Sequence, residues 1–191
     1  MVVIFSLSSA LASPNDNAKE LKIDTKKSKV EWLGKKVTGQ HDGEVSVKNG
    51  TLLIDKGELQ GGNIVIDMNS IKVTDIKDEE TNGKLVGHLK SSDFFHVEEY
   101  PEASFKITEV EKLDEKNKYL LKGEMTIRGI TNKEEFPATV MIKNGNVAAV
   151  GTMSIDRSKY EVKYASDAFF EDLGDKMIYN DFQLTYKIGA K

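Results

Sequence analysis

Two Asn-Gly pairs, each lying between short apolar-rich runs, constrain the fold of this chain more than any other feature. The pairs are Asn49-Gly50 and Asn144-Gly145. Type I′ hairpin turns need positive φ at both central residues, and Asn-Gly between apolar runs is the strongest short signal for them. Each pair therefore predicts an antiparallel hairpin. Lys56-Gly57 and Gly61-Gly62 indicate further turns.

Apolar residues alternate with polar ones in three segments, 103–108, 122–128 and 182–188. Period-two alternation is typical of strands with one buried and one wet face. With the hairpin signals, it predicts roughly eight to ten strands in an antiparallel order. A closed barrel is favoured over a sandwich because closure removes the edges of a long meander. The strand pattern alone leaves that choice open.

Helical signals are few. The segment 79–89 places Leu85, Val86 and Leu89 at helical spacing. A short turn is expected at 92–95 with Ser92 as its cap, and a second short helix is expected at 167–173, ended by Gly174. The sequence thus predicts one or two short helical insertions in an all-β domain.

The N-terminal segment 1–12 is uncharged and apolar, and it ends in the A-x-A pattern Ala10-Leu11-Ala12. This pattern is typical of a secretory signal peptide cleaved near Ala12, although the positive n-region is missing. The alternatives are a frayed apolar terminus or a buried first strand. We expect a disordered lead-in at 13–18, a single domain at 19–191, and a periplasmic or secreted location.

Composition excludes several classes of protein. The absence of cysteine removes disulfides, thiolate metal sites, iron–sulfur clusters and cysteine nucleophiles. The 27 Lys and Arg are dispersed among 31 Asp and Glu, and the net charge is −4. A nucleic-acid partner is therefore not expected, because such proteins normally carry a basic stripe. No apolar stretch is long enough to suggest a membrane-spanning helix.

Signals for catalysis and metal binding are weak. The sequence has no G-x-S-x-G elbow and no Walker loop, and its carboxylate pairs lie in polar runs typical of solvated faces. His88 and His96 flank Asp93, but H-x₄-D-x₂-H matches no standard zinc pattern. We therefore expect structural roles for the histidines, no catalytic residues, no metal and no cofactor.

Aromatic residues are spread through the predicted strands and insertions. They are consistent with a packed core or with a wall around an apolar ligand. An eight-stranded barrel can be filled by side chains or can hold one small ligand, and periodicity does not distinguish the two.

Three ordered segments resemble the YceI-like family: 87–105, 123–131 with Phe136-Pro137, and 155–158. The similarity covers roughly residues 20–189. It implies an extended antiparallel, eight-stranded, lipocalin-like β-barrel with an apolar central cavity. Members of the family are periplasmic or secreted binders of polyisoprenoid lipids, including quinone-type molecules, so the resemblance implies binding and no catalytic residue set.

The resemblance also places several residues. The segment 91–95 looks like the helical insertion beside the barrel mouth, and Phe105, Met125 and Ile127 look like strand residues with one side toward the interior. The stretch 163–178 is longer than usual in the family, so it could reshape or cap the mouth. The predicted cavity residues are Trp32, Phe94, Phe95, Phe105, Met125, Ile127, Phe170 and Phe182.

The expected function is binding, and transport or storage, of an isoprenoid-type lipid that is polyprenyl or quinone-like. Such a role includes transient contact with a membrane. Burying apolar chain contributes about 0.8 kcal/mol per CH₂, but a lipid in a bilayer has already left water, so we expect reversible exchange. The alternatives are an exported barrel with a filled core that acts through a protein partner, or an uncharacterised enzyme of the envelope. The oligomeric state is not predicted.

Overall fold

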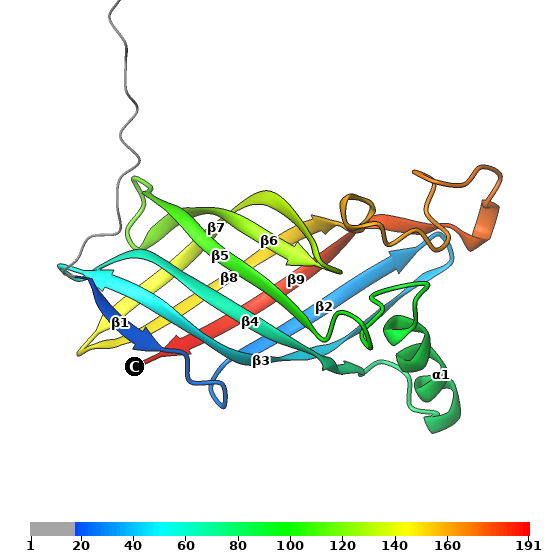
Figure 1. Ribbon diagram of the computed structural model, residues 1–191, viewed down its shortest axis with the longest axis horizontal. Coiled ribbons are helices and arrows are strands. Elements are labelled where there is room, and N and C mark those ends of the chain that lie inside the picture. The colour runs from blue at the N-terminus through cyan, green and yellow to red at the C-terminus, as the bar shows by residue number, and fades with distance from the viewer. Residues whose placement is uncertain (1–17) are drawn as a thin grey trace, which may run out of the picture.

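The computed structural model, which describes residues 18–191, is built mainly from strands longer than the usual five or six residues (Figure 1). All neighbouring strands pair antiparallel. The strands are β1 (Lys19–Lys22), β2 (Lys29–Lys36), β3 (Gly39–Asp55), β4 (Glu58–Val73), β5 (Glu102–Lys112), β6 (Lys118–Ile127), β7 (Ile130–Lys143), β8 (Asn146–Asp156) and β9 (Ile178–Ala190).

Strands β2 to β9 close into an eight-stranded barrel, because β4 pairs with β3 as well as with β5. The short strand β1 pairs with the second half of β3, beyond the part that pairs with β2. Lys22 also exchanges backbone hydrogen bonds with Lys191, at the end of β9. Strand β1 thus fills the place between β3 and β9 that β2 occupies farther along the barrel. The predicted all-β, eight-stranded antiparallel barrel is confirmed.

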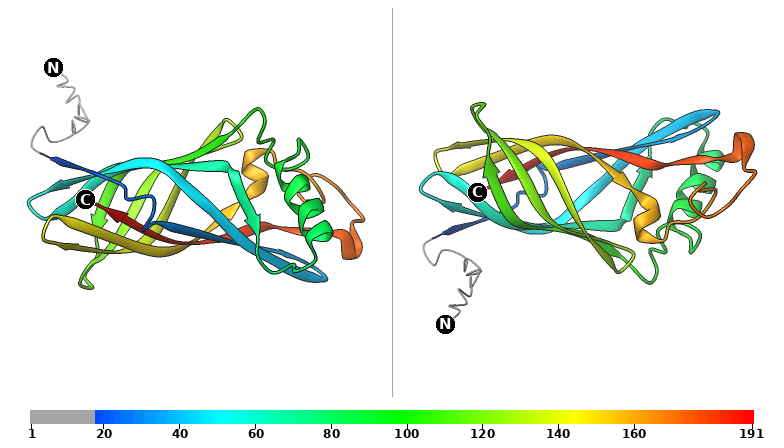
Figure 2. Two further views of the ribbon diagram at one scale, coloured as in Figure 1. Left: turned by 90° about the horizontal axis from the view of Figure 1, so that it is seen from below. Right: turned by 90° about the horizontal axis from the view of Figure 1, so that it is seen from above.

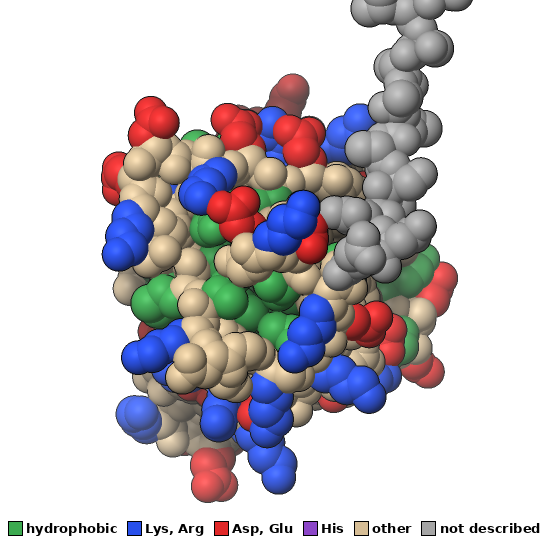
Figure 3. All heavy atoms as spheres, turned by 90° about the vertical axis from the view of Figure 1, so that its left-hand side faces the viewer, with side chains coloured by type: hydrophobic (Ala, Val, Ile, Leu, Met, Phe, Trp, Pro, Cys, Tyr) green, Lys and Arg blue, Asp and Glu red, His purple; other side chains and the backbone are tan. Residues whose placement is uncertain are grey.

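The two ends of the barrel differ. One end, called here the α1 end, carries the helix α1 (Glu79–Lys90), the β2–β3 and β6–β7 hairpins, and the segment 157–177 (Figures 1 and 2). That segment contains two short 3₁₀ helices, η1 (Arg157–Tyr160) and η2 (Gly174–Lys176). The opposite end carries three hairpin turns and the C-terminus. Figure 3 faces this end, where charged side chains of both signs surround hydrophobic ones.

Only one of the two Asn-Gly pairs forms a hairpin turn. Asn144-Gly145 forms the β7–β8 turn with positive φ at both residues, as predicted. The prediction for Asn49-Gly50 is wrong, because this pair lies inside β3 beside a β-bulge. Gly50 is needed there for close approach, since a Cβ at this position would lie 2.3 Å from the carbonyl oxygen of Asn63. The β3–β4 turn is made instead by Lys56-Gly57, which also has positive φ at both residues.

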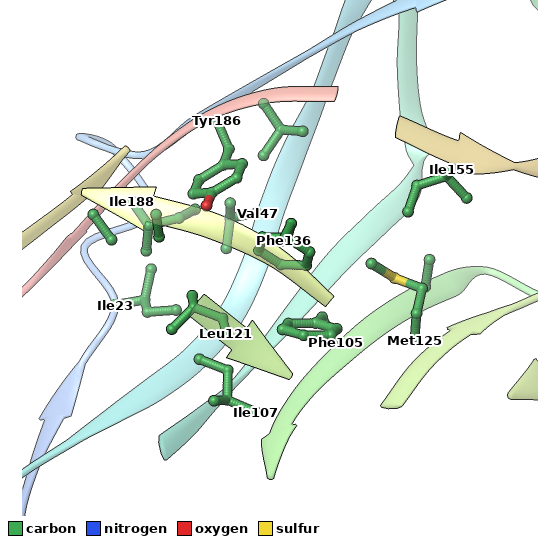
Figure 4. Close-up of a cluster of buried hydrophobic side chains, with 14 of the residues drawn as sticks. Ile23, Val47, Phe105, Ile107, Leu121, Met125, Phe136, Ile155, Tyr186 and Ile188 are labelled. Atoms are coloured by element: carbon green, nitrogen blue, oxygen red, sulfur yellow. The ribbon is translucent and has the colours of Figure 1, made fainter. Parts of the chain in front are cut away.

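The strand alternation is confirmed where it was predicted. Ala103, Phe105 and Ile107 are buried on β5, and the inward side chains of β6 and β9 meet them in the barrel interior (Figure 4). The outward positions of the same strands carry mostly charged and hydroxyl side chains. Period-two patterning therefore sets which residues face the interior.

Helix α1 confirms the segment predicted at 79–89. Its N-cap is Asp78, whose carboxylate accepts a hydrogen bond of 2.9 Å from the backbone N–H of Thr81. The turn at 92–95 is present, but Ser91 rather than Ser92 makes the side-chain contacts, because its hydroxyl donates to the His88 carbonyl. The helix predicted at 167–173 is wrong: that stretch has no helix, and only η2 follows it.

The predicted signal peptide at 1–12 and nearly all of the lead-in at 13–18 lie outside the described residues, so both stay predictions. Among the helices of residues 18–191, none has the length and apolar character needed to cross a membrane.

Candidate ligand-binding cavity

A cavity of about 240 Å³ runs inside the barrel. All eight barrel strands contribute to its wall, together with α1 and the turn at 91–95. Most of the lining side chains are aliphatic or aromatic, and they come from the inward face of each strand. The wall thus offers an apolar chain continuous contact on every side, which a filled barrel does not.

The structure brings together most of the side chains predicted to bind ligand. Seven of the eight predicted residues line the cavity: Trp32, Phe94, Phe95, Phe105, Met125, Ile127 and Phe182. Phe170 does not line it. This residue is 50% exposed on the segment 157–177, where it borders a surface depression with Tyr164 and Lys163. The segment 157–177 lies at the α1 end, outside the barrel interior, and leaves the Phe170 side chain half exposed.

The sequence interpretation missed much of the aliphatic wall. Strand β4 contributes Ile64, Ile66 and Met68, which repeat with period two and could have been chosen by the same rule as the residues of β5. Met153 and Leu184 complete the wall on β8 and β9. Tyr186 and Arg157 also line the cavity, and no local pattern assigns them a role.

The cavity reaches the surface at the α1 end. Lys35 and Lys36 of β2 and Tyr179 of β9 line it there, and all three are exposed. Leu85 and Leu89 place the apolar side of α1 across the same end. We call this opening the mouth.

Two side chains with polar groups near the mouth form hydrogen bonds within the protein. The indole Nε1 of Trp32 donates to the carbonyl of Lys72 at 3.2 Å, which leaves the ring against the cavity. The Nδ1 of His41 lies 2.8 Å from Oδ2 of Asp75. These partners hold the Trp32 and His41 side chains in place beside the opening.

Arg157 organises the segment that follows β8. Its guanidinium is buried, with 3% exposure, and donates to four backbone carbonyls. Nη1 reaches those of Val162 and Tyr164 at 2.7 and 2.9 Å, Nη2 reaches Ile178 at 2.9 Å, and Nε reaches Tyr179 at 3.2 Å. Burial lowers the pKa of Arg157, while the nearby carboxylates of Asp156 and Asp167 act to raise it. One side chain thus joins the 157–164 segment to the start of β9.

An aromatic cluster joins α1 to this segment. The ring of His88 packs edge-on against Phe94 and Tyr164, with centroid distances of 5.3 and 4.4 Å. The Arg157 guanidinium lies 5.6 Å from the centre of the Phe94 ring.

The Nδ1 of His96 lies 3.2 Å from a carboxylate oxygen of Glu99. Within residues 18–191, the acidic and histidine side chains form no group of three or more that could hold a metal ion.

An eight-stranded antiparallel barrel with an apolar interior and one covered mouth defines the class of this protein. The chain belongs to the YceI-like family, because the YceI-like domain matches residues 21–190. It is also 36% identical over 89 residues to the UPF0312 protein plu2095 of Photorhabdus laumondii. That match covers 47% of this chain and spans 45% of the relative, less than half of its length.

Solved structures share the fold. BcnA of Burkholderia cenocepacia has a TM-score of 0.66 at 23% identity, covering 88% of this chain and 99% of that one. A polyisoprenoid binding domain of Saccharophagus degradans, implicated in plant cell wall breakdown, has a TM-score of 0.62 at 14% identity, covering 90% and 97%. The YceI protein of Campylobacter jejuni has a TM-score of 0.55 at 19% identity, covering 76% and 82%.

Proposed function

We propose that this barrel binds an isoprenoid-type lipid, polyprenyl or quinone-like, in its central cavity and carries or stores it. The apolar wall, continuous from the mouth through all eight strands, is the observation that supports this proposal most directly. The shared fold with the polyisoprenoid binding domain of Saccharophagus degradans agrees with it. Organic extraction of the purified protein followed by mass spectrometry tests it, and an extract without lipid, together with no uptake on loading, would contradict it.

The energetics favour a reversible carrier. A buried chain gains about 0.8 kcal/mol per CH₂ relative to water, but little relative to a bilayer that already shields it. The cavity therefore suits exchange of lipid across an aqueous compartment rather than strong extraction. With the N-terminal segment proposed as a signal peptide, that compartment would be the periplasm or the exterior of the cell.

The mouth is surrounded by exposed apolar side chains. Six large hydrophobic residues of the described chain are exposed, and five belong to the α1 end. These five, called here the rim, are Val37, Tyr164, Phe169, Phe170 and Tyr179. We propose that the rim makes transient contact with a bilayer surface, where Tyr and Phe side chains are well accommodated. Charges of both signs adjoin the rim, such as Lys36 and Glu171, so apolar contact would dominate.

Replacing Phe169 and Phe170 together by serine is expected to slow lipid transfer between donor and acceptor vesicles roughly fivefold or more, because two half-exposed rings no longer enter the bilayer surface. The measurement is a fluorescence transfer assay with a labelled prenyl lipid. Met141→Ser is the matched control, since Met141 is 49% exposed on β7 and away from the mouth. Equal slowing by both variants would count against a membrane-facing rim.

Trp32 provides an intrinsic signal for occupancy, because it is the single tryptophan and lines the cavity. A prenyl quinone bound with its ring near Trp32 is expected to quench the Trp32 emission by at least about half at saturation, because the quinone ring accepts an electron or energy from the excited indole at short range. A fluorescence titration measures this. Unchanged emission at a quinone concentration that displaces a bound hydrophobic dye would remove Trp32 from the site.

A further inference from the structure

The helix α1 carries two glycines in its interior, on the side that faces solvent. Gly83 and Gly87 are four residues apart, so they lie on one face of the helix, and both are exposed. A Cβ at either position would meet no neighbouring atom within 4 Å, and neither glycine has positive φ. Neither a close approach nor a special backbone conformation therefore requires glycine at these two positions.

Glycine weakens a helix, because its backbone gains more freedom than that of other residues when the helix unfolds. Compared with alanine, each glycine inside a helix favours the unfolded form roughly fourfold to fivefold. Packing offsets little of this loss, since Leu89 is the one buried residue of α1. The central turn of α1, residues 83–87, is therefore easy to unfold.

Hydrogen bonds to the barrel hold α1 on both sides of this turn. Before it, the Nδ2 of Asn82 donates to the carbonyls of Val73 and Ile76, each at 2.9 Å. After it, the Lys90 ammonium donates to the Asn69 carbonyl at 2.7 Å. The two ends of α1 can therefore stay in place while the central turn unfolds.

The central turn lies at the mouth of the cavity. Leu85, between the two glycines, is half-buried and lines the cavity, and Val86 packs against the same core. Both views of Figure 2 show α1 at this end of the barrel. Unfolding of the turn would withdraw Leu85 and Val86 from the core and widen the mouth, without breaking any strand of the barrel.

We propose that the central turn of α1 is a lid, whose local unfolding, made easy by Gly83 and Gly87, admits and releases the apolar ligand of the cavity. The inference rests on the proposed function and adds the route of exchange. The population of the open turn sets how fast ligand enters and leaves. It does not set the affinity, because entry and exit pass through the same open state.

The test replaces both glycines by alanine and follows uptake of the neutral dye N-phenyl-1-naphthylamine by stopped-flow fluorescence. Two alanines favour the closed turn roughly twentyfold, so the rate constants for dye entry and exit are each expected to fall at least about tenfold in Gly83→Ala with Gly87→Ala. The equilibrium affinity for the dye should change by less than about twofold, because both rate constants fall together. Hydrogen–deuterium exchange of the amides in residues 83–87 should slow in the same variant.

Two further variants act as controls. Lys84→Gly places a third glycine at an exposed position of the same turn and should speed dye entry and exit roughly threefold. Gly189→Ala is the matched control for the added methyl groups. Gly189 lies on β9 away from the mouth, and a Cβ there would make an ordinary contact of 3.6 Å with Lys27. Its dye kinetics should equal those of the wild-type protein.

The outcomes separate the lid from the proposed function. Slower amide exchange in the central turn with unchanged dye rates would overturn the lid and leave ligand binding intact. Unchanged amide exchange in the double alanine variant would also overturn it, because the glycines would then not set the stability of the turn. A fall in dye affinity with an unchanged exit rate would overturn it by assigning the effect to an altered cavity. If the wild-type protein takes up no dye, the proposed function fails, and the lid fails with it.

Discussion

Replacing Arg157 by methionine is expected to lower the free energy of unfolding by about 3 kcal/mol, because four backbone carbonyls lose a buried charged donor. Methionine fills similar space but donates nothing. Arg157→Lys should recover less than half of the loss, since one ammonium group cannot reproduce the planar fork that serves four acceptors. Urea unfolding followed by circular dichroism measures the change.

The matched control for Arg157 is Arg128, at the β6–β7 turn. Its Nη1 donates to the carbonyls of Phe94 and Glu161 at 2.7 and 2.9 Å, but the side chain is only half-buried. Arg128→Met should therefore cost clearly less than Arg157→Met. Because Arg157 joins the segment 157–164 to β9, its loss should also make the segment 157–177 sensitive to proteolysis. A larger loss from Arg128→Met would contradict the central position assigned to Arg157.

The strands and their buried faces could be predicted because that information is local and repeated. Alternation along β5, β6 and β9 specifies which face is buried. Closure into a barrel is left open by the strand pattern and is implied by the resemblance to the YceI-like family. The two Asn-Gly pairs show the limit of local signals. Asn144-Gly145 forms its turn, whereas Asn49-Gly50 is carried inside β3, because pairing on both sides of a 17-residue strand outweighs the local preference for a turn.

The same limit of local sequence signals decides which residues of the cavity could be predicted. Phe105, Met125 and Phe182 lie on strands whose apolar and polar residues alternate. Their inward direction therefore follows from the period of two. Phe170 lies in the irregular segment 157–177, where no repeating pattern indicates which side chains face the cavity.

Filling the cavity from its wall is expected to have the largest effect on binding. Ala149 lies on β8, is buried and lines the cavity. In Ala149→Phe, a ring enters the space that the lipid chain would occupy, so the affinity for a prenyl quinone or a hydrophobic dye should fall at least about thirtyfold. Because the ring enters empty space, the free energy of unfolding should change by no more than about 2 kcal/mol.

Ala148 is the matched control for this substitution. It precedes Ala149 on the same strand, so its side chain points to the other face of the sheet, and it does not line the cavity. Ala148→Phe should bind dye and quinone as the wild-type protein does. Dye titration and urea unfolding of both variants separate a blocked cavity from a damaged barrel. If Ala149→Phe is folded and keeps full affinity, the ligand lies elsewhere. If both variants lose affinity in parallel with stability, the barrel as a whole, rather than the volume of the cavity, controls binding.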